Sequence, residues 1–294
     1  MNSALTSAQP AKSLGAPFAA LVVGALAMGA SPIFVRLADV GPLTSAFWRV
    51  ALALPILYLW MRIAERDGAP SLAFSRATVL GGLAFAGDLF FWHLSIVKTT
   101  VANATFFATT APIWVVVFGW LLFRQRVSRN VLTGLGLCIL GGAALVAQSL
   151  RLQGGHALGD MFGVATGLFF GLYFLAVRAA RARSSAARVT FEAALITAGV
   201  LLLVALTQEH RFWPESFAGL LALLGLAWIS HVGGQGLLAV ALGRLPAVFS
   251  SLVIFLESIA AACFGWALLG EPVTLLQAAG GLAILLGIYI ARPR

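Results

Sequence analysis

Long apolar runs constrain the fold of this chain more than any other feature of its sequence. Ten stretches of roughly 20 residues are nearly free of charge and are separated by short polar turns. Only 10% of the residues are charged, whereas a soluble domain carries about 25%. So few charges cannot cover a surface exposed to water, so a lipid bilayer must surround most of the chain. Backbone groups in lipid must be satisfied internally, and runs of this length fit α-helices, since a barrel strand needs only ~10 residues.

The sequence therefore predicts an all-α membrane protein with ten transmembrane helices. These helices are expected at approximately 17–38, 44–62, 77–97, 101–123, 129–149, 157–181, 187–206, 217–241, 245–268 and 273–292. Turn signals separate the runs, for example at 67–70, Gly154-Gly155 and 270–272. The segment 1–16 is polar and weakly basic, and we expect it to form a cytoplasmic N-terminal tail. The apolar run after it is about 20 residues long and lacks a convincing cleavage site, so we expect a first span and not a signal peptide.

The basic residues are distributed unequally between the two sides of this predicted topology. Five of the 19 fall on one side, namely Arg36, Arg49, Lys98, Arg151 and Arg211. The other 14 share the side of both chain ends. Cytoplasmic loops of membrane proteins carry an excess of Lys and Arg, so we expect both termini in the cytoplasm. The expected location is the inner (plasma) membrane of the cell. The net charge of +9 lies in short loops and does not indicate nucleic-acid binding.

The two halves of the chain match each other when one is shifted by 146 residues. Phe118-Gly119-Trp120 then falls on Phe264-Gly265-Trp266, and two glycines of the first half fall on Gly280 and Gly287. Each half holds five predicted spans, an odd number, so the second copy must enter the membrane upside down. We therefore predict two inverted five-helix repeats at 17–149 and 157–292, an arrangement that places a substrate near the midplane between them.

Several short motifs carry a resemblance to a known family. Thr110-Ala111-Pro112 leads to Gly119-Trp120 in the first half, and Leu256-Glu257 leads to Gly265-Trp266 in the second. Phe47-Trp48-Arg49 resembles an aromatic–Arg element of a second helix. These residues are similar to the drug/metabolite transporter superfamily, in particular its EamA-type ten-helix exporters.

Within that superfamily the chain is most similar, by overall likeness, to the amino-acid exporters called YddG. The resemblance implies export of small metabolites. Two departures from the family pattern stand out: Arg124-Gln125 where the pattern has Gly-Glu, and Ser258 where it has Pro. In the second half, Gly270-Glu271 does match the Gly-Glu of the pattern, but the two departures weaken the case for a functional role of Glu271.

Two acidic residues fall near the middle of predicted spans. Asp88 lies in the third helix and Glu257 in the ninth. A charge at this depth costs ~2.5–3.5 kcal/mol on insertion scales and should face a cavity or a partner. Two interpretations stay open, a cavity site for a substrate amino group or a proton, and a buried hydrogen bond that fixes packing. Glu192 is instead expected to pair with Arg188, one turn earlier.

Polar and aromatic residues occupy equivalent faces of the third and eighth helices. Asp88 and Trp92 lie one turn apart, as do His231 and Gln235, and Tyr173 of the sixth helix is expected to reach the same cavity. The predicted substrate-binding residues are Asp88, Trp92, Tyr173, His231, Gln235 and Glu257. His231 fits equally well as a hydrogen-bonded histidine within the helix bundle.

Other residues predict how the helices pack. A glycine recurs every fourth residue from Gly159 to Gly171 and should let another helix approach closely. Proline residues 32, 55 and 112 lie within predicted spans and are expected to kink them. His93 is expected to lie toward the membrane interface.

The leading functional prediction is a facilitator or secondary transporter that exports neutral and aromatic amino acids by alternating access through a central cavity. No nucleophile motif, phosphate-binding loop or metal-ligand cluster is present in the sequence, so neither enzymatic activity nor a cofactor is expected. Two alternatives stay open, a proton-coupled exporter of cationic drugs and a membrane scaffold without transport activity. The sequence does not fix the oligomeric state, and a monomer is compatible with it.

Overall fold

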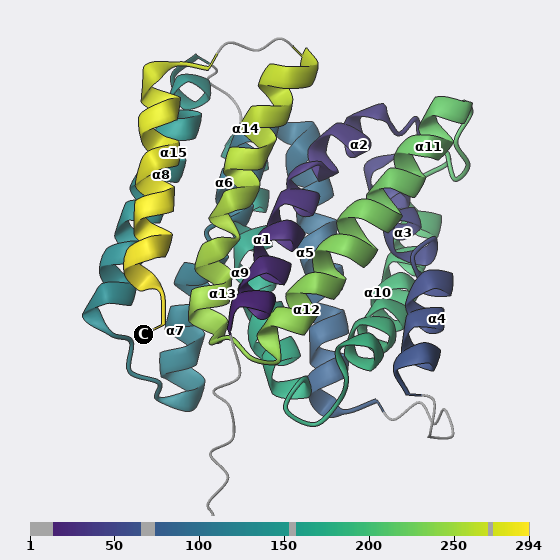
Figure 1. Ribbon diagram of the computed structural model, residues 1–294. Coiled ribbons are helices and arrows are strands. Elements are labelled where there is room, and N and C mark those ends of the chain that lie inside the picture. Colours follow the sequence, from purple (N-terminus) through teal and green to yellow (C-terminus); the bar gives the residue numbers. More distant parts are fainter. Residues whose placement is uncertain (1–13, 66–73, 153–156, 270–272, 294) are drawn as a thin grey trace, which may run out of the picture.

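The computed structural model describes residues 14–65, 74–152, 157–269 and 273–293, and these ranges are helical without strands (Figure 1). The elements are α1 (Gly15–Gly29), α2 (Ser31–Leu37), α3 (Pro42–Ala51), α4 (Leu54–Ala64), α5 (Arg76–Lys98), α6 (Val101–Ala108), α7 (Ala111–Phe123), α8 (Arg129–Leu152), α9 (Ala157–Ala180), α10 (Ala186–Gln208), α11 (Phe217–Gly225), the π-helix η1 (Leu226–Gln235), α12 (Gly236–Leu242), α13 (Ala247–Val253), α14 (Phe255–Leu269) and α15 (Leu275–Ala291). Most of the predicted tail 1–16, the turn at 67–70, Gly154-Gly155 and Glu271 lie outside the described residues.

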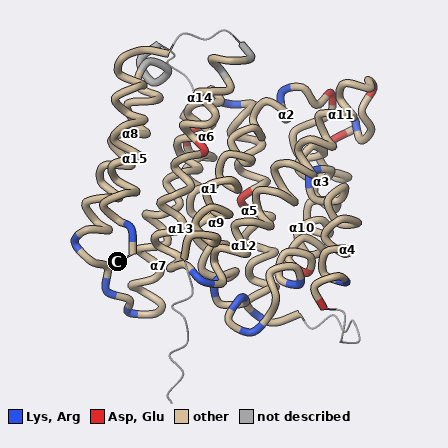
Figure 2. The backbone as a smooth tube through the Cα atoms, in the orientation of Figure 1, with Lys and Arg blue, Asp and Glu red and all other residues tan. Residues whose placement is uncertain are grey.

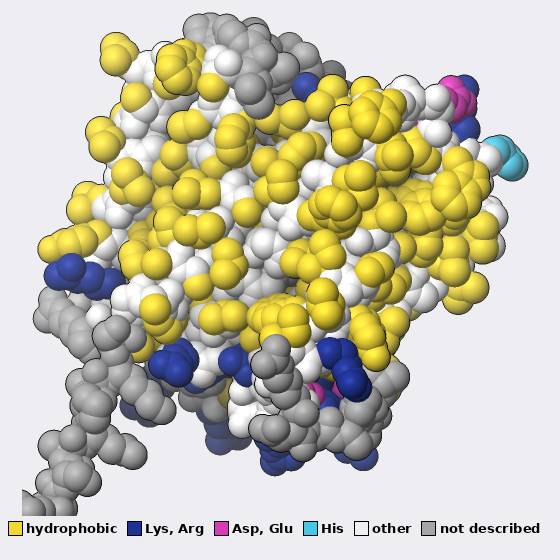
Figure 3. All heavy atoms as spheres, turned by 45° about the vertical axis from the view of Figure 1, so that its right-hand side comes forward, with side chains coloured by type: hydrophobic (Ala, Val, Ile, Leu, Met, Phe, Trp, Pro, Cys, Tyr) yellow, Lys and Arg dark blue, Asp and Glu magenta, His cyan; other side chains and the backbone are white. Residues whose placement is uncertain are grey.

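The helices are long and apolar enough to make this a multi-pass membrane protein. Over the described ranges, nine helical stretches of at least 18 residues could cross a membrane, and the apolar α15 is shorter, with 17 residues. Hydrophobic side chains cover a broad band of the surface in Figure 3, and most of the Lys and Arg side chains in this view lie below it. Large apolar side chains such as Trp120 and Leu140 are more than 60% exposed, which suits contact with lipid.

Three of the spans are interrupted where the sequence places a proline. The breaks between α1 and α2, between α3 and α4, and between α6 and α7 each precede Pro32, Pro55 or Pro112, which sits in the first turn of the second segment. Proline lacks a backbone N–H and clashes with the preceding turn, which is the physical reason for the break. The predicted kinks at these three positions are confirmed.

Two further interruptions occur without a proline. The stretch η1 is a π-helix between α11 and α12. A single residue, Ile254, separates the end of α13 from the start of α14. Five helical stretches are therefore irregular along their length. Irregular backbone at membrane depth is tolerated where it is buried in protein or lines a cavity.

The helices α8 and α15 pack against each other along one side of the molecule (Figure 1). Four glycines make this contact in two pairs. A methyl group at Gly287 would lie 2.6 Å from the carbonyl oxygen of Gly134, and one at Gly280 would lie 2.5 Å from that of Gly141. The residue order reverses between the two helices, so they run antiparallel and their backbones touch where only glycine fits.

The predicted glycine stripe of α9 packs against α6 and α7. A methyl group at Gly163 would meet the side chain of Phe107, and one at Gly171 would meet Trp114. The close approach expected from the repeated glycines is therefore present as a packing contact.

Basic residues gather at one end of the bundle. Figure 2 shows most Lys and Arg on the side where α1 begins and α15 ends, and Figure 1 places these two helix ends on that same side. The opposite end carries fewer charges, of both signs. The two ends of the bundle therefore differ in charge, as expected for a protein with a fixed orientation in the membrane.

Candidate functional site

A pocket lies where the interrupted helices converge. Residues from α1, α3, α5, α6, α9, η1 and α14 line it, so both halves of the chain contribute. The lining residues are Met28, Arg49, Asp88, Leu89, Trp92, Ala108, Phe170, Gln235 and Glu257. Four of the six predicted binding residues, Asp88, Trp92, Gln235 and Glu257, are thus brought together by the fold.

The pocket is narrow in this conformation. Its free volume, measured as space open to the centre of a water molecule, is about 20 Å³. That space holds about one or two water molecules and excludes a metabolite. The lining side chains must therefore separate before a substrate of the size of an amino acid can enter.

Arg49 is a pocket residue that our sequence analysis misplaced. We counted it among the basic residues at a membrane surface, yet it is only 4% exposed. The helix α3 begins at Pro42, so Arg49 lies seven residues, or ~10 Å, along it. Its Cζ atom lies 5.5 Å from the ring centroid of Trp92. The sequence did offer a clue to this burial, since Arg49 lies inside an apolar run, seven residues after the proline of the Gly41-Pro42 turn.

The two carboxylates reach the pocket from opposite halves of the chain. Asp88 lies in the middle of α5, and Glu257 lies in the first turn of α14, directly after the break at Ile254. They are 6% and 7% exposed. The positive end of the α14 dipole favours a negative charge at Glu257. Within the described residues neither carboxylate has a hydrogen-bond partner, so both can bind a ligand or water in the pocket.

Gln235 closes the π-helix η1 and points its amide at α1. Its Nε2 atom lies 3.1 Å from the Sδ atom of Met28, a weak acceptor. Its Oε1 atom is buried and has no hydrogen-bond partner in the part of the chain that the structure describes. π-helical segments occur frequently at functional sites, and here the segment delivers an unsatisfied amide to the pocket.

The other two predicted residues lie behind the pocket wall. The ring of Phe85 lies 4.7 Å from Tyr173 and 5.4 Å from His231, measured between centroids. Tyr173 in turn stacks on Phe170, which lines the pocket. Both ring nitrogens of His231 are buried without a partner among the described residues. Neither side chain lines the pocket in this conformation, so their part in binding stays a prediction.

His93 is a buried polar residue beside the pocket residue Trp92. Its ring is fully buried and packs edge-on against Trp92. Its Nδ1 atom is 2.8 Å from the carbonyl oxygen of Leu89. This backbone partner allows the polar ring to stay in the core. The expected place of His93 toward the membrane interface stays a prediction.

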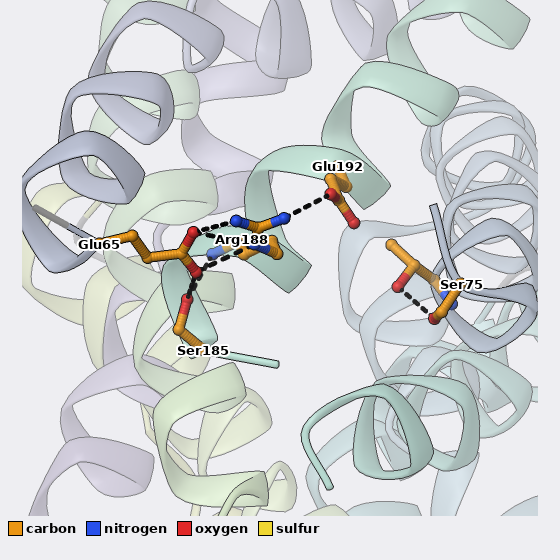
Figure 4. Close-up of polar contacts among 6 residues, drawn as sticks. Glu65, Ser75, Ser185, Arg188 and Glu192 are labelled. Carbon is orange, nitrogen blue, oxygen red and sulfur yellow. Dashed lines mark hydrogen bonds and ion pairs between the residues drawn. The ribbon is translucent and has the colours of Figure 1, made fainter. Parts of the chain in front are cut away.

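Polar contacts tie α4 to α10 at the basic end of the bundle (Figure 4). The Oγ atom of Ser185 donates to Glu65 at 2.6 Å, and Nε of Arg188 donates to both carboxylate oxygens of Glu65 at 2.9 and 3.0 Å. Hydrogen bonds from Arg188 hold the pKa of Glu65 below its usual value. The predicted pair of Arg188 with Glu192 is also present, at 3.8 Å.

A second carboxylate joins α10 to α3, the first segment of the same span, at the other end of the bundle. Glu209, which follows the last residue of α10, accepts hydrogen bonds from the backbone N–H groups of Leu43 and Thr44, each at 2.8 Å. These donors belong to the first turn of α3 and would otherwise lack partners. Carboxylates therefore join the α3–α4 span to α10 at both membrane surfaces while the pocket between the halves is narrow.

Comparison with known proteins identifies the family of the chain. The model of the EamA-like transporter family matches residues 16–147 and again residues 157–292. The chain belongs to the EamA-like transporter family. It is thus a membrane transporter, and the pocket lies within the transporter's helical bundle. The family resemblance noted from the sequence is confirmed; a specific likeness to the YddG exporters stays a prediction.

Several relatives of this EamA-like transporter have descriptions. An "Uncharacterized transporter" of Archaeoglobus fulgidus is 26% identical, with 93% of this chain and 95% of that protein covered. The pseudopaline exporter CntI of Pseudomonas aeruginosa is 24% identical over 84% and 85%. A "Probable amino-acid metabolite efflux pump" of Salmonella typhimurium is 26% identical over 58% and 60%. A crystal structure shares the fold, with a TM-score of 0.79, 16% identity, and 95% and 98% coverage.

Proposed function

We propose that this EamA-like transporter exports small metabolites, chiefly neutral and aromatic amino acids, by alternating access through the pocket between its halves. The main observation that supports this proposal is the set of side chains that line the pocket. Asp88 and Glu257 offer buried carboxylates for a substrate amino group, while Trp92 and Phe170 offer aromatic surface for an apolar side chain. Small-molecule sites combine apolar walls with a few oriented polar groups in this way.

Two relatives support export, and one of them supports the class of substrate. One is described as a probable amino-acid metabolite efflux pump and the other as a pseudopaline exporter. The resemblance to the YddG exporters points in the same direction. Either a facilitator or a secondary transporter fits these observations.

We also propose that the chain consists of ten transmembrane helices in two inverted repeats, 17–149 and 157–292. The spacing of the helices supports this arrangement. Val101 and Ala247 begin α6 and α13, while Arg129 and Leu275 begin α8 and α15; the members of each pair are 146 residues apart. The two matched segments of the family model divide the chain at the same place.

Equivalent contacts between helices give independent support for the repeat. A methyl group at Gly29 would lie 3.0 Å from the carbonyl oxygen of Glu257, and one at Gly171 would lie 3.0 Å from that of Ala111. Glu257 and Ala111 are again 146 residues apart. The contact of α1 with α14 thus has a counterpart in the contact of α9 with α7. The antiparallel glycine pairs of α8 and α15 fit a two-fold axis that lies in the membrane plane.

The charge distribution supports an orientation with both termini in the cytoplasm and the protein in the inner (plasma) membrane. The end of the bundle where α1 begins and α15 ends carries the excess of Lys and Arg. A reporter fused to the C-terminus should therefore be active only if it functions in the cytoplasm. A C-terminal fusion that is active only in the periplasm would contradict this topology.

Purified protein in liposomes tests the proposed function. We expect efflux of preloaded phenylalanine and leucine above the rate of protein-free liposomes, measured for a panel of amino acids with and without a pH gradient. A gradient-dependent rate would identify a secondary transporter, and an independent rate a facilitator. Export of a cationic dye in exchange for protons, with no amino-acid flux, would instead support the cationic-drug alternative. If no solute moves, a scaffold role gains support.

A further inference from the structure

We propose that Arg49 binds the carboxylate of the exported metabolite, so that the pocket selects substrates that carry both a carboxylate and an amino group. This inference rests on the proposed function and assigns a specificity-determining residue to it. The substrate class is that of zwitterionic α-amino acids and related amphoteric metabolites.

The first argument is the lack of a close partner for a buried charge. Arg49 is 4% exposed, and its Nε atom has no hydrogen-bond acceptor within the described part of the chain. The ion pairs at 4.0 Å or less among those residues involve Arg188 and Arg211, and none involves Arg49. A guanidinium inside a membrane protein is costly unless it faces a water-filled cavity or an anionic partner. A substrate carboxylate in the pocket supplies that partner.

The second argument is the position of the guanidinium. It lies over the Trp92 ring, with 5.5 Å between Cζ and the ring centroid. A cation–π contact is not a hydrogen bond, so the N–H donors of the guanidinium still need an acceptor. Those donors form a rigid fork that matches the two oxygens of a carboxylate. Trp92 therefore helps to position Arg49 but provides no hydrogen-bond acceptor for its guanidinium.

The third argument is charge complementarity. The same pocket holds one guanidinium and the two carboxylates of Asp88 and Glu257, supplied by three different helices. A substrate with an amino group alone would leave Arg49 without an anion at close range. A substrate with a carboxylate alone would leave both acidic side chains without a cation. A zwitterion offers a partner to each sign of charge, and selection follows because unpaired buried charges are penalised.

The competing explanation is that Arg49 only balances the two carboxylates and stabilises the fold. Substrate analogues separate the two roles in the wild-type protein. Phenylalanine, phenylethylamine and 3-phenylpropionate share one ring and differ in their charged groups. We expect phenylalanine efflux from liposomes to exceed phenylethylamine efflux by at least about tenfold, since a hydrogen bond to a charged group is worth ~10- to 150-fold in binding. Equal rates for the two would overturn the assignment.

Variants then test the residue itself. Arg49→Gln should raise the KM for phenylalanine at least about tenfold and reduce the preference for phenylalanine over phenylethylamine, while Arg49→Lys should retain part of both. Arg36→Gln is the matched control, because Arg36 is an exposed arginine at the end of α2. Unchanged KM and preference in Arg49→Gln would overturn the proposal.

Two results keep this inference separate from the proposed function. If the wild type transports amino acids and Arg49→Gln keeps the preference for phenylalanine over phenylethylamine, only the role of Arg49 is contradicted. Absence of amino-acid transport by the wild type removes the proposed function. If Arg49→Gln does not fold, as judged by size-exclusion chromatography in detergent, the Arg49→Lys variant and the analogue comparison in the wild type decide.

Discussion

A Gly141→Leu variant should be markedly less stable in detergent than the wild type. Gly141 faces Gly280 and Ile284 of α15, and even a methyl group there would press on the Gly280 backbone. A backbone carbonyl cannot rotate away as a flexible side chain can, so the two helices must separate. Overpacking typically costs ~1–3 kcal/mol, and a leucine at a glycine crossing is expected to exceed that range. We expect the melting temperature in detergent to fall by at least about 5 °C.

The same helix offers a matched control. Gly136 lies five residues from Gly141 in α8, and no atom lies within 4 Å of a methyl group placed there. Gly136→Leu makes the same change in helix propensity without the steric conflict and should leave the melting temperature close to that of the wild type. A Gly141→Leu variant as stable as Gly136→Leu would show that α8 and α15 do not meet at these glycines.

The positions of the helices could be predicted from the sequence because lipid imposes a simple rule. Each span needs an apolar run long enough to cross the bilayer, and the turns between runs are polar. The breaks before Pro32, Pro55 and Pro112 were equally accessible, since proline acts locally. The π-helix η1 was not, because an i→i+5 segment depends on packing against neighbouring helices rather than on a residue pattern.

The candidate site could be predicted only in part. Polar residues are rare in apolar runs, so Asp88, Gln235 and Glu257 stood out, and the structure brings all three to one pocket. Arg49 was missed because the positive-inside rule treats an arginine near a turn as a surface charge. The burial of His93 could not be predicted from composition, because the backbone partner of its ring, Leu89, lies on its own helix.

The largest expected effect on transport is at the two carboxylates of the pocket. Glu257→Gln and Asp88→Asn keep the size of each side chain and remove its charge. Each change weakens binding of the substrate amino group and leaves Arg49 with one fewer negative charge nearby. We expect each variant to reduce phenylalanine efflux from liposomes by roughly 10- to 150-fold, the value of a hydrogen bond to a charged group. Initial rates at equal amounts of reconstituted protein measure the effect.

Glu215→Gln is the control for this pair of variants. Glu215 undergoes the same chemical change as Glu257, but its side chain is 65% exposed and pairs with Arg211 in the same exposed segment. It should transport phenylalanine like the wild type, because an exposed ion pair contributes little. If Glu257→Gln and Asp88→Asn both matched this control, the carboxylates would serve packing alone. If only one of them lost activity, that carboxylate would be the partner of the amino group, and the other would balance the charge of Arg49.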